Sequence, residues 1–169
     1  VEAKVMKMKK TYGFARLMKV LQPSPYRVEP KCPVAKQCGG CQIQEMDYAE
    51  QLAFKENKVK NNLMRIGGFV EEEIPMEPVV GMENPWRYRN KAQFPIGRDK
   101  NGNIVAGFYA GRTHNIISNR NCYLGVEQNQ EILDIVIAHM EQYDIDPYHE
   151  VTGKGLVRHV LIRYGFTTK

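Results

Sequence analysis

Four cysteines constrain this chain more strongly than any other feature of its sequence. Three of them, Cys32, Cys38 and Cys41, form the segment C-x5-C-G-G-C, and the fourth, Cys122, lies far along the chain. Four thiols can close a tetrahedral zinc site or hold a four-iron cluster. The two glycines before Cys41 permit a tight turn that brings backbone N–H groups near sulfur. The spacing therefore predicts a metal site that ties an ordered loop at residues 32–46 to a distant segment.

Other uses of the four cysteines stay open on spacing alone. Two disulfides are possible, but this chain resembles a cytosolic protein, and disulfides are rare in cytosolic proteins. Structural zinc is the stronger alternative, although zinc sites usually combine two close cysteine pairs and this chain has one. Four unrelated cysteines would leave the C-G-G-C clustering without an explanation. The spacing favours an iron–sulfur cluster, with zinc as the main alternative.

Basic residues are concentrated in two stretches of the chain, which has a net charge of +5. Residues 1–31 carry eight Lys and Arg against two Glu, and residues 86–120 carry seven against one Asp, so each stretch is +6. A phosphate-binding face would give this pattern, and so would a solvated strand face. No apolar run approaches the roughly 18 residues of a membrane span. The start of the chain has no signal-peptide core, so we expect a cytoplasmic protein without membrane contact.

Hydrophobic periodicity predicts an α+β fold with an antiparallel sheet, two helices and a cysteine-rich metal loop. The strands are expected as a pair within residues 1–28 and at 86–96, 104–109, 115–118 and 156–166, and the helices at 48–65 and 127–143. Asp47 should cap the first helix. The strand pair cannot stand alone, so it is expected to be the remnant of a small β-barrel. The core-facing stripes should be Leu52, Val59, Leu63 and Ile66 on the first helix and Ile132, Ile135, Val136, His139 and Met140 on the second.

One predicted strand has a basic face. From Trp86 to Ile96, apolar side chains alternate with a second set that includes Arg87, Arg89 and Lys91. Arg112 and His114 follow the next hairpin and are expected to extend this surface. Basic side chains bind phosphates, and aromatic side chains stack on splayed bases. The predicted RNA-binding residues are Arg87, Arg89, Lys91, Arg112 and His114.

Several of these segments together resemble the RNA (uracil-5-)-methyltransferase family, of the iron–sulfur type that modifies bacterial large-subunit ribosomal RNA. The segment CPVAKQCGGCQIQEMDYAEQLAFKENKV is similar to the iron–sulfur segment of that family. Cys122, after GFYAGRTHNIISNRNC, is similar to the fourth cluster ligand, and NPWRYRNKAQFPIG to a basic strand of the same domain. Residues 1–28 resemble the end of the TRAM domain, an OB-like RNA-binding barrel.

The resemblance implies that the chain is part of a larger enzyme. Residues 1–28 would be the C-terminal part of the TRAM domain, and residues 29–169 the truncated central domain with a 4Fe-4S cluster on the four cysteines. The catalytic domain, which binds S-adenosylmethionine and carries the nucleophile, would be absent. No catalytic or S-adenosylmethionine-binding residue is therefore assigned here, and the fragment should be inactive alone.

Ribosomal RNA is the expected partner, and no obligate protein partner is indicated. Three alternatives stay open: a stand-alone RNA-binding module with zinc or a cluster, a transfer RNA uridine-5 methyltransferase, and an electron-transfer protein. The cluster is expected to be structural, because methyl transfer from S-adenosylmethionine to an activated carbon needs no electron.

Overall fold

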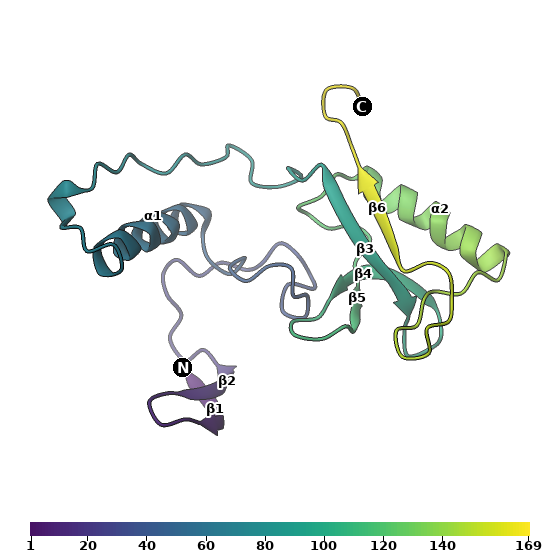
Figure 1. Cartoon of the computed structure of the whole chain (residues 1–169), viewed down its shortest axis with the longest axis horizontal. Helices are drawn as coiled ribbons and strands as arrows, with labels where there is room; N and C mark the ends of the chain where they lie inside the picture. The colour runs from purple at the N-terminus through teal and green to yellow at the C-terminus, as the bar shows by residue number, and fades with distance from the viewer.

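The computed structural model describes all residues from Val1 to Lys169. An antiparallel sheet of four strands forms one part of the molecule, in the order β5-β4-β3-β6. The strands are β3 (Lys91–Arg98), β4 (Ile104–Tyr109), β5 (Ile116–Ser118) and β6 (His159–Arg163). Helix α2 (Gln128–Gln142) runs along this sheet (Figure 1). The predicted α+β class is confirmed.

The hydrophobic core lies between the sheet and α2. Phe94, Leu133 and Met140 are its largest fully buried side chains. Each such side chain stabilises the fold by roughly 1.5–3 kcal/mol through removal from water. The core consists of Phe94, Ile96, Ile104, Ala106 and Ile162 from the strands and Leu133, Ile137 and Met140 from the helix.

The apolar stripe predicted for α2 is wrong in part. Met140 is buried and Val136 packs against the core, as expected. Ile135, in contrast, is 63% exposed, and His139 is exposed and packs on Tyr143. The helix carries two overlapping apolar sets at helical spacing, and the sheet takes the one that contains Leu133. Periodicity alone does not choose between two such sets.

The strand predicted from Trp86 begins later. Its pairing with β6 starts at Lys91, and Arg87 has a φ of 57°, which breaks strand alternation. The segment before β3 pairs instead with the Cys122 loop, where the Arg87 N–H donates to Tyr123 O at 2.9 Å and the Arg89 N–H to Leu124 O at 2.9 Å. Arg87, Arg89 and Lys91 therefore do not share one strand face.

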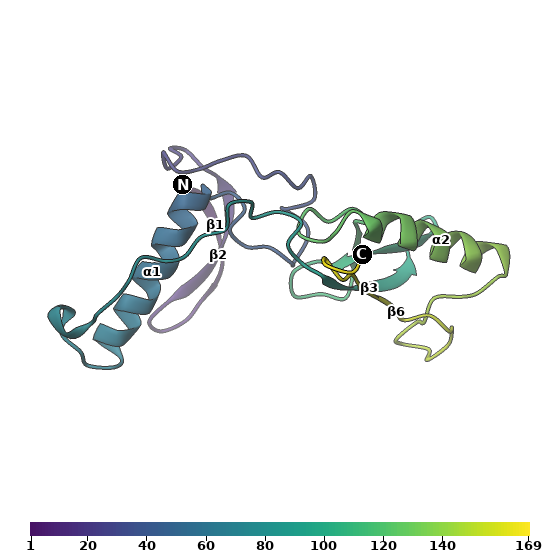
Figure 2. The same cartoon turned by 90° about the horizontal axis from the view of Figure 1, so that it is seen from above.

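The first part of the chain forms a separate arm. Strands β1 (Glu2–Met8) and β2 (Gly13–Lys19) make an antiparallel hairpin whose residues are all exposed. Helix α1 (Tyr48–Arg65) begins as predicted, with the Asp47 side chain accepting from Ala49 N at 3.0 Å. Figures 1 and 2 both show the hairpin and α1 away from the four-stranded sheet.

The arm buries little apolar surface. No residue of α1 is buried, and Val59 and Ile66 of its predicted stripe are 52% and 83% exposed. The hairpin has no further strands beside it, so no closed barrel is present. A short 3-10 turn at Glu71–Glu73 lies in the connector that leads from α1 to the sheet. No helix has the length and apolar character needed to cross a membrane.

Candidate metal centre

The cysteine-rich loop lies against the end of β4. The Gly39 N–H donates to Tyr109 O at 2.9 Å, and Cys38 forms a bridge with Ala110. A Cβ atom at Gly39 would lie 2.9 Å from Tyr109 O and 3.0 Å from the Gly111 backbone. Glycine is needed here because any side chain would force the two backbones apart. Close approach of the loop carries its cysteines toward the sheet.

All four cysteines line one small cavity, of about 40 Å³, between the loop and the sheet. Cys32 is buried, the other three are half-buried, and none forms a disulfide. The structure thus brings Cys122 to the three loop cysteines from a distant part of the sequence. The remaining lining residues are Gly40, Gln44, Arg89, Phe108, Asn119, Tyr123 and Leu124.

Two of the sulfurs receive hydrogen bonds from the surrounding chain. The Gly40 N–H donates to Cys38 Sγ at 3.4 Å, so the second glycine of the C-G-G-C segment acts as the sequence suggested. The Asn119 side-chain amide lies 3.9 Å from Cys32 Sγ and donates to it. Sequence reasoning missed Asn119, because no spacing rule connects it to Cys32. Donors of this kind stabilise negative charge on sulfur.

Burial raises the pKa of both Cys32 and Cys38. Hydrogen bonds lower each pKa, while the charges of neighbouring cysteines raise it further; Cys41 and Cys122 contribute at both sites. Thiolates at Cys32 and Cys38 are therefore unfavourable in this cavity unless a cation compensates them. Bound metal supplies such a charge and releases the thiol protons. The donor set thus fits a thiolate-bound metal group.

The geometry does not match a single-ion site. No group of three or more His, Cys, Asp or Glu side chains in the chain is arranged to hold a metal ion. In tetrahedral zinc the four sulfurs lie about 3.8 Å apart, since each is about 2.3 Å from the ion. The four cysteines here share a cavity without this compact arrangement. Their role as metal ligands stays a prediction.

Arg87 fastens the Cys122 loop to the segment before β3. Its guanidinium donates to Cys122 O at 2.9 Å and to Gly125 O at 3.1 Å. It also lies 3.6 Å from a Glu127 carboxylate oxygen and 5.1 Å from the centre of the Tyr123 ring. The side chain is 23% exposed. These contacts give Arg87 a structural role that the strand pattern did not predict.

Arg89 and Lys91 lie in different surroundings. Arg89 lines the cysteine cavity, and its guanidinium is 6.0 Å from the centre of the Tyr88 ring. Lys91 is exposed and directly opposite Arg163 on β6. Two opposed cations repel each other, so a bound anion would be favoured there. Sequence reasoning missed Arg163 because strand register cannot be derived from one strand alone.

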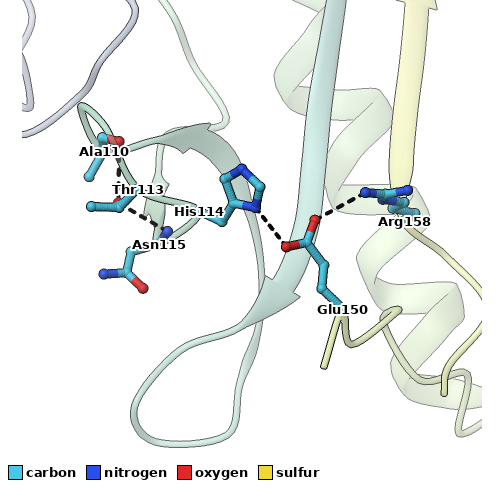
Figure 3. A network of polar contacts seen from close by, with 6 residues as sticks. All are labelled: Ala110, Thr113, His114, Asn115, Glu150 and Arg158. Atoms are coloured by element: carbon cyan, nitrogen blue, oxygen red, sulfur yellow. Dashed lines mark hydrogen bonds and ion pairs between the residues drawn. The ribbon is translucent and has the colours of Figure 1, made fainter. Parts of the chain in front are cut away.

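Arg112 and His114 follow β4. Arg112 is exposed with a φ of 63°, and His114 packs on Tyr109. His114 Nδ1 donates to Glu150 at 2.6 Å, and Arg158 donates to the same carboxylate at 3.0 Å (Figure 3). Both hydrogen bonds lower the pKa of Glu150, and the one from His114 has the larger effect. His114 therefore connects two surface loops, and its expected RNA contact stays a prediction.

A wider hollow lies on the other side of the cysteine loop. It has a volume of about 500 Å³ and lies between β2 and the loop. Lys19 and Lys36 line it, while Arg27, also in its wall, is paired with Glu45. Cys41 lines both this hollow and the cysteine cavity. Lys19, from the first basic stretch, thus lies beside the candidate metal centre together with Lys36.

Comparison with known proteins gave named relatives but no matching family model. The chain is 46% identical over 167 residues to an uncharacterized RNA methyltransferase of Bacillus cereus, covering 99% of this chain and 36% of that protein. It is 44% identical over 168 residues to an uncharacterized RNA methyltransferase of Clostridium tetani, with the same coverage. The chain therefore spans about a third of the length of these relatives.

A solved structure shares the fold. The tRNA (uracil-54, C5)-methyltransferase of Pyrococcus abyssi, in complex with S-adenosyl-L-homocysteine, matches with a TM-score of 0.66 and 25% identity. The match covers 98% of this chain and 35% of that protein. The fold of nearly the whole chain therefore corresponds to about a third of a longer protein.

Proposed function

We propose that this chain is the RNA-binding and metal-binding part of an S-adenosylmethionine-dependent RNA uridine-5 methyltransferase. The observation that carries the proposal is the similarity, along nearly the whole chain, to proteins named RNA methyltransferases. The uridine-5 specificity rests on the sequence resemblance and on the similar fold of a uracil C5 methyltransferase.

The chain would position RNA, and the rest of the protein would carry out the chemistry. Residues 1–28 would belong to an RNA-binding barrel and residues 29–169 to the central domain. A base must leave its stack to reach the methyl donor, which requires a firm hold on the flanking RNA. Lys91, Arg163 and Arg112 are suited to this because they are exposed and form no ion pair within the chain.

The metal group in this proposal is a 4Fe-4S cluster held by Cys32, Cys38, Cys41 and Cys122. The support for it is the resemblance of the cysteine segment to an iron–sulfur segment, together with the all-thiol lining of one shared cavity. When bound, the cluster would supply positive charge to four thiolates and cross-link the loop to the sheet. Zinc is the competing assignment.

Metal analysis after anaerobic reconstitution tests this assignment. We expect about four irons per chain and the broad visible absorption of a thiolate-bound cluster. If the protein instead contains stoichiometric zinc and no iron, the site is a zinc site and not a cluster site. Cys122→Ser should abolish iron retention, because it removes the single ligand on the sheet side. If the Cys122→Ser variant retains all its iron, Cys122 is not a ligand of the cluster.

Ribosomal RNA is the proposed substrate, on the basis of the iron–sulfur type that the cysteine segment resembles. Transfer RNA is the second candidate, favoured by the substrate named for the Pyrococcus abyssi enzyme. The complete protein should be incubated with S-adenosylmethionine and either ribosomal or transfer RNA transcripts, followed by nuclease digestion and mass spectrometry. 5-Methyluridine found only in ribosomal RNA supports ribosomal RNA as the substrate. 5-Methyluridine found only in transfer RNA supports transfer RNA. Formation in neither RNA would contradict the proposed function.

A further inference from the structure

The turn between β4 and β5 is held by its own hydrogen bonds. The Ala110 N–H donates to Asn115 O at 2.8 Å, and the Thr113 N–H donates to Ala110 O at 3.1 Å. The Thr113 hydroxyl also donates to Ala110 O at 3.2 Å and accepts from the Asn115 N–H at 3.2 Å (Figure 3). These bonds fix the backbone that carries Arg112 and His114.

The His114 ring is held in one orientation but stays open to solvent. It stacks on the Tyr109 ring, with the centroids 5.0 Å apart and the planes 25° from parallel. Its edge bonds to Glu150 at 2.6 Å, and Arg158 donates to the same carboxylate at 3.0 Å (Figure 3). The His114 side chain is nevertheless 70% exposed. A connection between two loops needs only the ring edge, so the exposed ring surface has no part in it.

The charge around this ring favours an anionic partner. Arg112 is exposed and forms no ion pair with any carboxylate of the chain. Glu150, the carboxylate that contacts His114, is also paired with Arg158, so its negative charge is compensated. RNA offers both a phosphate for Arg112 and a flat base for the His114 ring.

We infer that the His114 ring is a stacking platform for one unpaired RNA base, with Arg112 binding an adjacent phosphate. The inference rests on the proposed function, because it requires that this part of the protein bind RNA. It gives His114 a contact through the face of its ring, in place of the charge contact that the sequence suggests. Every base has a π face, so this contact adds affinity with little preference for sequence.

Two substitutions separate stacking from a role in connecting the loops. His114→Phe keeps a flat ring beside Tyr109 and loses the hydrogen bond to Glu150. His114→Gln keeps a donor for Glu150 and loses the ring. Binding of a short fluorescein-labelled single-stranded RNA to the complete protein is measured by anisotropy. We expect His114→Gln to bind about tenfold more weakly than wild type, as for loss of one base stacked on an aromatic side chain. His114→Phe should bind almost as tightly as wild type.

The salt dependence of binding separates stacking from a phosphate contact. His114→Gln should leave the slope of log affinity against log salt unchanged, whereas Arg112→Gln should reduce it by about one contact. His139→Gln is the matched control, since His139 is an exposed histidine on α2 that packs on Tyr143. This control should bind RNA as wild type does, and circular dichroism verifies that each variant is folded.

The inference is overturned if His114→Gln binds RNA as tightly as wild type, or if it lowers the salt slope as Arg112→Gln does. It is also overturned if His114→Phe binds as weakly as His114→Gln, because the hydrogen bond to Glu150 would then be what matters. In each of these outcomes the wild-type protein still binds RNA, and the proposed function stands. If the wild-type protein binds no RNA, the proposed function fails together with the inference.

Discussion

Single side chains decide how the Cys122 loop is held, and Arg87 is the principal one. We expect Arg87→Ala to destabilise the fold by about 2 kcal/mol, because hydrogen bonds to charged groups contribute about 1.5–3 kcal/mol and two carbonyl groups would lose their donor. Urea unfolding measures the effect. Lys100→Ala, at an exposed turn, should stay within about 0.5 kcal/mol of wild type. Equal effects of the two changes would contradict a structural role for Arg87.

Asn119 acts directly on the cysteine site, because its side-chain amide donates to Cys32 Sγ. Asn119→Ala removes the donor to Cys32 Sγ, and hydrogen bonds to the sulfurs help to set cluster potentials. If the proposed cluster is bound, the midpoint potential of the reconstituted protein should shift to a more negative value. Asn121→Ala, at an exposed position close by, should leave it unchanged. An unchanged potential in Asn119→Ala would show that this contact has no influence on the metal group.

Glu150 gives the fold a specific dependence on pH. Its pKa is lowered in the folded chain by hydrogen bonds from His114, which has the larger effect, and from Arg158. Stability from a lowered pKa is present above the ordinary carboxyl value and is lost as pH falls through the folded value. Glu150→Gln should therefore flatten the stability curve on the acid side, from about pH 5 downward. Unfolding at a series of pH values checks this. Glu141→Gln, an exposed carboxylate without an ion pair, should retain the wild-type slope.

Among the elements, α2 shows how far hydrophobic periodicity can be trusted. The helix was predicted within a residue at each end, but part of its buried face was not. We expect Leu133→Ala to cost about 2–5 kcal/mol, because Leu133 is fully buried. Ile135→Ala should cost far less, since that side chain is 63% exposed. Thermal unfolding of both variants decides which apolar set faces the sheet.

For strand β3, the pairing with β6 identifies a neighbouring cation that the periodicity of the strand could not predict. The prediction placed three cations on one face, whereas the register places Lys91 opposite Arg163. If this pair binds phosphate, Lys91→Ala with Arg163→Ala should reduce the salt dependence of RNA binding by about two contacts. The loss should be independent of RNA sequence. Lys100→Ala with Lys154→Ala, at two other exposed positions, removes the same charge and should leave the salt slope unchanged.

At the scale of the whole molecule, the sequence predicted local structure well and long-range placement poorly. Most helix and strand ranges follow from periodicity and from turn and capping residues such as Asp47. The position of Cys122 beside the loop came from cysteine counting and family resemblance, because no local rule relates residues so far apart. Arg163 and Asn119 were missed for the same reason: both act through contacts that exist only after the sheet has formed.

The separation of the arm from the sheet has a consequence for affinity. The hairpin and α1 make no extensive contact with the sheet, so the cysteine loop is the principal junction between two basic surfaces. Two weak binding surfaces joined by a junction act as one bivalent ligand, whose second contact forms at an effective concentration set by the stiffness of the link. A cross-linked junction would hold both surfaces at a fixed separation, while an open junction would let them bind independently. The occupancy of four thiols could thus change avidity for RNA without altering any residue that contacts it.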